Sequence, residues 1–248
     1  MINVLGICGS PRKGNSHYLL EKSLWSASQV APDQVSTELY PLKGKKFAPC
    51  ISCFKCGNQR GECIIQDDFQ GLRDKWLEVD AIIYSVPVYH MGIPAQLKAF
   101  LDRLGNSLFG RYAELFPGEA KLPRSLKVIA SIAQGAHLFS GQEHTITDLI
   151  NHALIMGCVP VTGDMWEAYI GAGAWTYNEV DRHVLKKKEK DGSLCTRVAL
   201  HGAESIGRRT VELAMILKTG GLAHSARFQK DPVYTPFLER IRESPGQE

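Results

Sequence analysis

The sequence predicts an α/β protein in which a parallel sheet of five strands is covered by helices on both faces. Short apolar segments rich in β-branched residues alternate along the chain with segments of helical periodicity, which is typical of such a sheet. The clearest strand segments, residues 2–8 and 80–86, are apolar almost throughout, as strands buried on both faces are. Glycine, serine or proline marks most of the turns between the two kinds of segment.

Each element follows from its own local pattern. The expected strands are residues 2–8, 34–40, 80–86, 126–133 and 158–162. Helices are expected where apolar residues recur every three or four positions, namely after Ser16, after Asp67 or Asp68, from Pro94 to Gly105, between Gly141 and Gly157, and over residues 195–218. We therefore expect a single domain over residues 1–220, with aperiodic insertions at 106–124 and 164–193 and a polar tail at 221–248.

The turn after the first strand, GSPRKGNS at residues 9–16, has the layout of an anion site. Free backbone N–H groups and the positive end of the following helix converge at such a turn. Ser10, Asn15 and Ser16 can add side-chain hydrogen bonds, and Arg12 can add a guanidinium group. The turn fits neither the glycine pattern of dinucleotide-binding folds nor that of nucleoside triphosphatases. It therefore predicts a phosphate-bearing ligand of another kind.

Four of the seven cysteines lie within fourteen residues, at Cys50, Cys53, Cys56 and Cys63. Three thiolates spaced by two residues, with a fourth a short loop away, favour an iron–sulfur cluster. A zinc site usually draws its ligands as two separated pairs, but the spacing alone leaves zinc or free thiols open. The cysteines belong to an unusually long connection at residues 41–66, and connections of that length are usually functional or disordered.

In an open parallel sheet every β-to-α loop lies at the carboxyl edge, where ligands bind. The phosphate turn, the cysteine connection, the 87–93 loop and the 134–141 loop are therefore expected to share that edge. This placement would join a phosphate-bearing ligand and a metal centre in one active region.

Composition excludes several other classes of protein. The formal charge is only +3, and the basic run at residues 186–188 has no interleaved aromatic residues, so a nucleic-acid partner is not expected. No apolar run reaches the length of a membrane span, and the N-terminus enters a strand pattern without a charged leader. We expect a soluble, cytoplasmic protein.

Together, these motifs resemble the iron–sulfur flavoproteins, a group within the flavodoxin-like NAD(P)H-dependent FMN reductases. The resemblance rests on GSPRKGNS, on the cysteine stretch with its following Asp67-Asp68, and on SVPVYHMGIPAQLKAFLDR at residues 85–103. It covers the first 104 residues well and the later sheet in pattern only. It implies a flavodoxin-like fold, FMN, and a 4Fe-4S cluster on Cys50, Cys53, Cys56 and Cys63.

The resemblance also implies which residues hold the flavin. The FMN phosphate would lie at Ser10, Arg12, Asn15 and Ser16, and the isoalloxazine ring at Pro87, Val88, Tyr89 and His90. Tyr89 and His90 are also weak candidates for proton donors, whereas Asp102 and Arg103 are expected to form a structural ion pair. The loop after the fourth strand is often a Gly-Gly pair in the family, whereas here it is Gln134-Gly135, so the backbone is expected to approach the flavin less closely.

The implied function is an oxidoreductase that passes electrons from ferredoxin or NAD(P)H through the cluster and FMN to a small acceptor such as a quinone, an oxygen species or a nitro compound. One alternative is an electron-transfer module for a protein partner. Another is a plain FMN or quinone reductase whose cysteines hold zinc or nothing. Such proteins are oligomers, so a homodimer or homotetramer is expected, with the cluster of one subunit close to a flavin across the contact.

Overall fold

A twisted parallel sheet forms the centre of the computed structural model, which describes residues 1–117 and 121–242. The strand order is β2-β1-β3-β4-β5, with β6 also paired to β4, and every pairing is parallel. This order confirms the predicted flavodoxin-like fold, whose ligand crevice lies where the strand order reverses. The strands are β1 (Ile2–Cys8), β2 (Val35–Pro41), β3 (Ala81–Pro87), β4 (Val128–Gly135), β5 (Val159–Pro160) and β6 (Ala172–Trp175).

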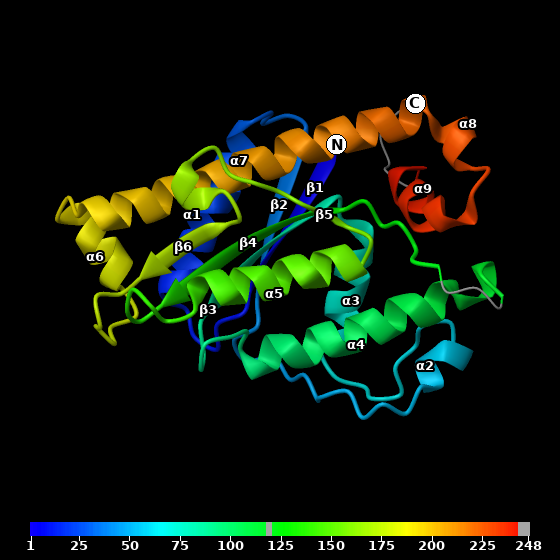
Figure 1. Cartoon of the computed structure of the whole chain (residues 1–248), viewed down its shortest axis with the longest axis horizontal. Coiled ribbons are helices and arrows are strands. Elements are labelled where there is room, and N and C mark those ends of the chain that lie inside the picture. Colours follow the sequence, from blue (N-terminus) through cyan, green and yellow to red (C-terminus); the bar gives the residue numbers. More distant parts are fainter. Residues whose placement is uncertain (118–120, 243–248) are drawn as a thin grey trace.

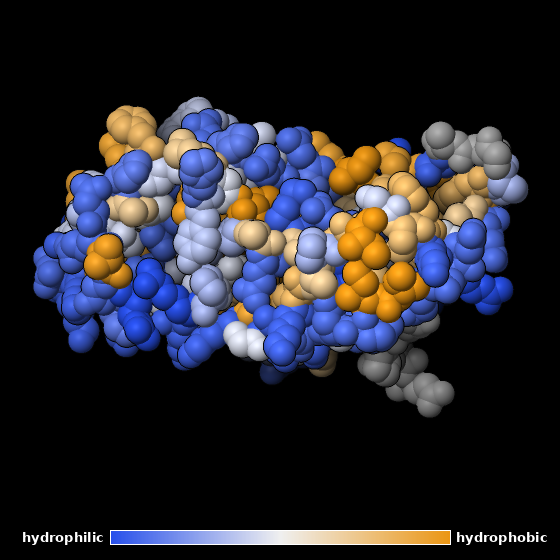
Figure 2. Space-filling view, turned by 90° about the horizontal axis from the view of Figure 1, so that it is seen from below, coloured by the Kyte–Doolittle hydropathy of each residue, from blue (hydrophilic) through white to orange (hydrophobic). Residues whose placement is uncertain are grey.

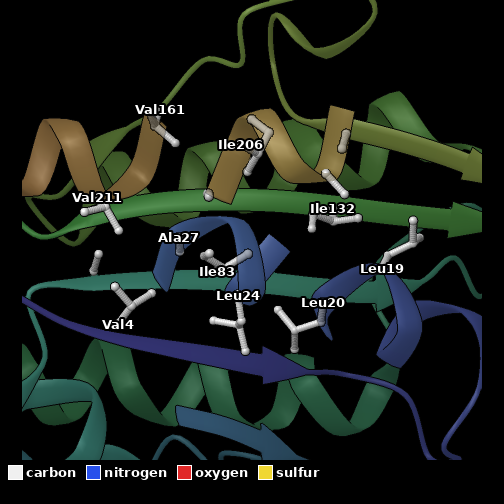
Figure 3. Close-up of a cluster of buried hydrophobic side chains, with 14 of the residues drawn as sticks. Val4, Leu19, Leu20, Leu24, Ala27, Ile83, Ile132, Val161, Ile206 and Val211 are labelled. Atoms are coloured by element: carbon white, nitrogen blue, oxygen red, sulfur yellow. The ribbon is translucent and has the colours of Figure 1, made fainter. Parts of the chain in front are cut away.

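Helices cover both faces of the sheet (Figure 1). On one face α1 (Asn15–Gln29) and α7 (Leu194–Ala223) enclose an apolar core over β1, β3 and β4, with Leu20, Ile83 and Ile206 at its centre (Figure 3). On the other face the core lies under α3 (Phe69–Glu78), α4 (Ala95–Tyr112) and α5 (Gln142–Ile155). Burying one such large apolar side chain contributes roughly 1.5–3 kcal/mol, so these two layers hold the sheet in place.

The expected fifth strand at 158–162 is wrong in extent, because the edge of the sheet is divided between two short strands. β5 pairs only with Val128 and Ile129 at the start of β4. The chain then leaves the sheet through the 3-10 turn η2 (Trp166–Ala168) and returns as β6, which pairs with residues 132–135 at the end of β4. Part of the expected 164–193 insertion is therefore a strand, followed by α6 (Val184–Lys190). Its sequence, AGAW, has too few large apolar residues to predict a strand.

Helix α4 is also longer than the sequence predicts. Gly105 was expected to end it, but the helix runs on to Tyr112 and is followed by η1 (Ala113–Leu115). Leu104, Leu108 and Tyr112 are buried at successive turns, so the apolar stripe continues past the glycine. Of the expected 106–124 insertion, residues 106–112 are therefore helical, and residues 118–120 lie outside the described residues.

The C-terminal segment packs on the rest of its own chain as far as residue 242. Helices α8 (Ser225–Phe228) and α9 (Thr235–Arg242) follow α7, joined by the 3-10 turn η3 (Pro232–Tyr234), and α9 buries Phe237, Leu238 and Ile241. Arg240 donates to the carbonyl of Ser125 at 2.6 Å and pairs with buried Asp80 at 3.4 Å. The remaining residues of the expected tail, 243–248, lie outside the described residues. No helix in the described part of the chain is long and apolar enough to cross a membrane.

Candidate functional site

Three loops meet at the carboxyl edge of β1, β3 and β4, as expected. Residues 9–16 follow β1, residues 88–93 follow β3 and residues 136–141 follow β4. The N–H of Gly9 donates to the carbonyl of Ser85 at 2.9 Å, and the N–H of Val88 donates to the carbonyl of Gln134 at 2.8 Å. These bonds fasten each loop to the neighbouring strand.

The phosphate turn and the end of β4 are joined by side chains. The Ser16 hydroxyl donates to Gln134 Oε1 at 3.4 Å, and the Ser85 hydroxyl donates to the Ser16 carbonyl at 2.7 Å. Ser10 is buried, and its Oγ accepts from the N–H of Arg12 at 3.3 Å. The structure thus brings together Ser10, Ser16, Pro87, Val88, Gln134 and Gly135 from the expected FMN set.

Two other residues of the expected phosphate set are placed differently. Arg12 is exposed at the turn. Asn15 points its amide to the 164–193 segment, where Nδ2 donates to the Asp181 carbonyl at 3.1 Å and Oδ1 accepts from the Leu185 N–H at 3.0 Å. The side chain of Asn15 therefore holds α6 against the turn, and its backbone N–H is what remains for a phosphate.

Tyr89 and His90 lie in a tight turn at the tip of the 88–93 loop. Tyr89 and Gly92 exchange backbone hydrogen bonds of 3.0 and 3.1 Å. Between them, His90 and Met91 adopt positive φ values of 46° and 68°. Residues other than glycine rarely adopt this conformation, and such strain clusters at ligand sites. The turn presents Tyr89, His90 and Met91 to solvent above the carboxyl edge.

The four clustered cysteines surround one hollow in the cysteine loop (residues 41–66). Cys50, Cys53, Cys56 and Cys63 all line it, and α2 (Lys55–Asn58) forms part of its wall. Burial raises the pKa of the Cys56 thiol, and the neighbouring thiols of Cys63 and Cys53 raise it further. The other three cysteines, Cys8, Cys158 and Cys195, are unpaired and lie elsewhere.

A buried ion pair fixes both ends of this hollow. Arg103, whose side chain is 1% exposed, pairs with Asp67 at 2.7 Å and donates to the carbonyl of Ile65 at 2.7 Å. The Asp67 carboxylate also accepts from the N–H groups of Ala48 and Phe69, at 2.8 and 2.9 Å. Burial alone would raise the pKa of Asp67, but the Arg103 guanidinium and these N–H groups lower it below its ordinary value. The sequence suggested instead that Arg103 would pair with Asp102, which in fact pairs with Lys98.

The second half of α4 forms the floor under the cysteines. Asn106 Nδ2 lies 3.6 Å from Cys50 Sγ, within hydrogen-bond range of sulfur, and 3.2 Å from the Asp102 carbonyl. The Ser107 hydroxyl donates to the carbonyl of Gly61 at 2.5 Å. A Cβ on Gly110 would lie 2.4 Å from the carbonyl oxygen of Cys56, so α2 rests directly on the α4 backbone.

The cysteine loop does not share the carboxyl edge, which corrects the sequence-based expectation. It starts there, where Gln96 Nε2 donates to the carbonyls of Leu42 and Lys45 at 3.1 and 2.6 Å. It then runs along α4 away from the edge. Asn106, beside Cys50, lies eleven residues along α4 from Ala95, or about 16 Å at 1.5 Å per residue. In Figure 1 the arrowheads of β4 and β6 and the label α2 lie at opposite ends of the molecule.

The residues around the hollow fit a thiolate-bound cluster. Asn106 supplies an N–H donor to one sulfur, and hydrogen bonds to sulfur tune such clusters. Arg103 also lines the hollow, and its buried Nε has no hydrogen-bond partner. Among the described residues no group of three or more His, Cys, Asp or Glu side chains is arranged to hold a single metal ion.

Asn106 and Gly110 are the residues of this site that the sequence did not single out. Residues 106–112 were predicted to belong to an insertion, because glycine is common just after the end of a helix and Gly105 was taken as that end. The spacing of Leu101, Leu104 and Leu108 is the signal that could have extended the helix.

Comparison with known proteins identifies relatives of this chain. Residues 2–167 match the family model of the NADPH-dependent FMN reductases. The chain is 31% identical over 219 residues to the iron-sulfur flavoprotein MJ1083 of Methanocaldococcus jannaschii, covering 88% of this chain and 100% of that protein. It is 30% identical over 178 residues to an iron-sulfur flavoprotein of Archaeoglobus fulgidus, covering 72% and 85%.

Solved structures show the same fold. A flavone reductase superposes with a TM-score of 0.58 at 23% identity, covering 88% of this chain and 64% of that longer one. At this level of identity the likeness concerns the fold alone.

Proposed function

The chain belongs to the NADPH-dependent FMN reductase family, and within it to the iron–sulfur flavoproteins, and from this premise we propose that it moves electrons between a four-cysteine iron–sulfur cluster and FMN. That it is a flavin-dependent oxidoreductase using FMN follows from the family itself. The cluster, the electron donor and the acceptor are the proposal. The single observation that carries it is that all four cysteines of the C-x2-C-x2-C-x6-C stretch line one hollow.

The carboxyl edge is the proposed FMN site. The N–H groups at the start of α1, together with Ser10 and Ser16, would hold the FMN phosphate. Pro87, Val88 and Gln134 form the wall beside it, and the tip of the 88–93 loop supplies Tyr89 and His90 to the ring. FMN can exchange one or two electrons, which couples a one-electron cluster to two-electron chemistry.

The cysteine loop is the proposed cluster site. Cys50, Cys53, Cys56 and Cys63 would each bind one iron of a 4Fe-4S cluster. Asp67 and Arg103 hold the two ends of the loop in register, and α4 keeps its floor rigid. The chain's own contribution is therefore the position of four sulfurs and the donors around them.

The two sites of one chain lie far apart, which supports an oligomer. About 16 Å along α4 separates the carboxyl edge from Asn106 beside Cys50, and electron transfer between two centres slows as their separation grows. The cysteines also open to the surface, where Ile51, Phe54 and Ile64 are 61, 73 and 40% exposed. Figure 2 shows apolar surface gathered on this underside of the molecule. A second subunit seated here would bring its own carboxyl edge to the cluster.

Anaerobic spectroscopy tests the proposal directly. The purified protein should show flavin absorbance together with the broad absorbance of a cluster. Rapid mixing with a chemical reductant should bleach the absorbance of both the flavin and the cluster. Adding a quinone afterwards should restore both absorbances. If the flavin is reduced and reoxidised normally in a protein that contains no iron or sulfide, the protein is a plain FMN reductase and the cluster proposal fails.

The same surface favours a second candidate, an electron-transfer module for a protein partner. Lys43, Lys46 and Lys55 are exposed around the cysteine loop, whereas Lys45 pairs with Asp68 at 3.2 Å. Exposed lysines next to apolar residues suit an acidic redox protein such as ferredoxin. Slow turnover with every small acceptor, but fast and salt-sensitive oxidation of the cluster by ferredoxin, would select this function.

A further inference from the structure

Asn106 lies in the second half of α4 with its side-chain amide turned toward the cysteine loop. Its Nδ2 lies 3.6 Å from Cys50 Sγ and 3.2 Å from the carbonyl oxygen of Asp102, which is one turn earlier in the same helix. The residue also lines the hollow that the four cysteines share. In Figure 1 α2 and the loop that carries it lie below α4. Asn106 therefore links the backbone of α4 to a sulfur of the cysteine loop.

The two contacts of Asn106 together fix which end of its amide faces the sulfur. An amide side chain carries two N–H donors on its nitrogen, whereas its oxygen can only accept. The carbonyl of Asp102 can also only accept, so it must face the nitrogen. The second N–H of the same nitrogen is then the one that faces Cys50 Sγ. The bond to Asp102 thereby holds a donor, and not an acceptor, against the sulfur.

No other side chain donates to one of the four sulfurs within residues 1–117 and 121–242. The amides of Gln66 and Gln70 belong to the same region, but they donate to the carbonyl oxygen of Cys63, at 2.9 and 3.4 Å. The side-chain donation is therefore confined to Cys50, at one side of the set of four sulfurs.

Asparagine at this position is unfavourable for the helix itself. Asn106 lies well inside α4, which runs from Ala95 to Tyr112. Asparagine forms helices less readily than alanine or leucine, because its side chain competes for backbone hydrogen bonds. The side chain is exposed, so it adds no apolar burial in return. Residues that break a local rule without a gain in packing are expected at functional sites, and the contact with Cys50 is the gain that the structure shows.

We propose that Asn106 sets the reduction potential of the cluster through its N–H contact with Cys50. A donor on a ligand sulfur stabilises negative charge, and the reduced cluster carries one negative charge more than the oxidised one. The contact therefore raises the potential, so that the cluster is reduced more easily and gives up its electron to FMN less readily. The step is the transfer of one electron, and no bond to Asn106 forms or breaks. This role rests on the proposed function, because it requires the cluster.

Redox titration followed by electron paramagnetic resonance measures the potential in the parent, in Asn106→Leu and in Asn106→Asp. Leucine has a similar shape without the N–H, and aspartate places an oxygen where the nitrogen was. At a fixed potential we expect the ratio of reduced to oxidised cluster to fall about tenfold in Asn106→Leu, which corresponds to about 59 mV for a one-electron couple. Asn106→Asp should lower the potential further, since a carboxylate adds negative charge beside the sulfur.

Gln66→Leu is the matched control. It removes an exposed amide of the same kind, which donates to the carbonyl oxygen of Cys63 and not to a sulfur, so the potential should equal that of the parent. A second measurement distinguishes the hydrogen bond from a change of shape. In deuterated water, the pulsed magnetic resonance spectrum of the reduced cluster should lose the coupling of one exchangeable deuteron in Asn106→Leu and keep it in Gln66→Leu.

The outcomes separate this assignment from the proposed function. An unchanged potential in an Asn106→Leu protein that holds as much iron, sulfide and FMN as the parent would overturn the assignment and leave the proposed function intact. An equal shift in Gln66→Leu would also overturn it, because the loop as a whole would then set the potential. Loss of the cluster from both Asn106 variants would show that the residue holds the loop in place and would contradict a tuning role. A parent without iron and sulfide would refute the proposed function and this assignment together.

Discussion

Arg103 joins the two ends of the cysteine loop more directly than any cysteine does. Its guanidinium stacks 4.2 Å from the ring of Phe69 and pairs with Asp67 in a nearly dry environment. A buried pair of this kind adds little net stability over an apolar substitute, but removing one partner leaves a buried charge uncompensated. Its role is to fix where Ala48 and Ile65 lie, and with them the cysteines between.

We predict that Asp67→Asn destabilises the protein by about 3–5 kcal/mol and releases the cluster, because the Arg103 charge stays buried without its partner. Urea unfolding and iron content measure the two effects. Asp102→Asn is the control, since Asp102 pairs with Lys98 at the surface and such pairs contribute at most ~1 kcal/mol. Similar losses in both variants would contradict the assigned role of Arg103.

The half-buried His152 gives the fold a dependence on pH. Its Nε2 lies 3.3 Å from the hydroxyl of Tyr84, and burial lowers its pKa from 6.5 to about 4. Between pH 6.5 and pH 4, His152 is therefore protonated in the unfolded chain but neutral in the folded one. The contribution of neutral His152 to the free energy of unfolding is full above pH 6.5 and is lost as the pH falls toward 4.

We accordingly predict that the urea midpoint falls between pH 7 and pH 5, and that His152→Gln flattens this slope while lowering stability at pH 7. Unfolding curves of the parent and the variant at both pH values check it. Parallel slopes would mean that other groups cause the acid sensitivity.

At the residue scale, local spacing was enough to single out the cysteine stretch and the turn at residues 9–16. Their chemistry resides in neighbours along the sequence, so no tertiary information was needed. Arg103 was paired with the wrong acid, because adjacent residues on a helix point in different directions while Asp67 comes from a distant segment. Asn15 was predicted to be a phosphate ligand because the local sequence does not show that its side chain is hydrogen-bonded to Asp181 and Leu185, which lie far along the chain.

At the scale of elements, α4 links the two candidate sites. Its first turn follows the 88–93 loop at the carboxyl edge, and its last turns lie under Cys56. The sequence predicted the helix as far as Gly105 but not its continuation to Tyr112, since a single glycine in a helical pattern can either end a helix or lie within it. Strand β6 was missed for a related reason, because its small residues carry no strand signal and only pairing with β4 makes it a strand.

Two glycines of α4 give a matched test of its role. Gly110→Ala should displace α2, because the new Cβ would lie 2.4 Å from the Cys56 carbonyl oxygen, so iron is lost while FMN is retained. Gly105→Ala meets nothing within 4 Å and should stabilise the helix by roughly 0.5–1 kcal/mol with iron unchanged. Iron analysis and thermal unfolding distinguish the two. Full iron in Gly110→Ala would show that the cysteines do not depend on this floor.

At the scale of the whole molecule, the parallel sheet with helices on both faces was predicted from the sequence, but the position of the cysteine loop was not. Topology places the start of a β-to-α connection at the carboxyl edge and says nothing of where its 26 residues, 41–66, run. The contacts with α4 carry the cysteines away, so a partner chain is needed to bring flavin and cluster together in the proposed function.

We predict that the protein is a dimer or tetramer through the apolar surface around Ile51 and Phe54. Phe54→Glu should shift light-scattering mass toward the monomer and slow electron exchange between cluster and FMN. Trp25→Glu is the control, since Trp25 is also a large exposed aromatic (60%) but lies on α1. A monomeric parent at micromolar concentration would be incompatible with the proposed path.

The central claim is that Cys50, Cys53, Cys56 and Cys63 hold one 4Fe-4S cluster that exchanges electrons with FMN. Exposed cluster thiolates are vulnerable to oxygen, so the measurement requires anaerobic protein from cells grown with ample iron. It is the iron, acid-labile sulfide and FMN content per chain, with electron paramagnetic resonance after reduction, in the parent and in Cys53→Ala. The account predicts roughly four irons and four sulfides in the parent, and their loss with FMN retained in the variant. Stoichiometric zinc without sulfide in the parent would contradict it.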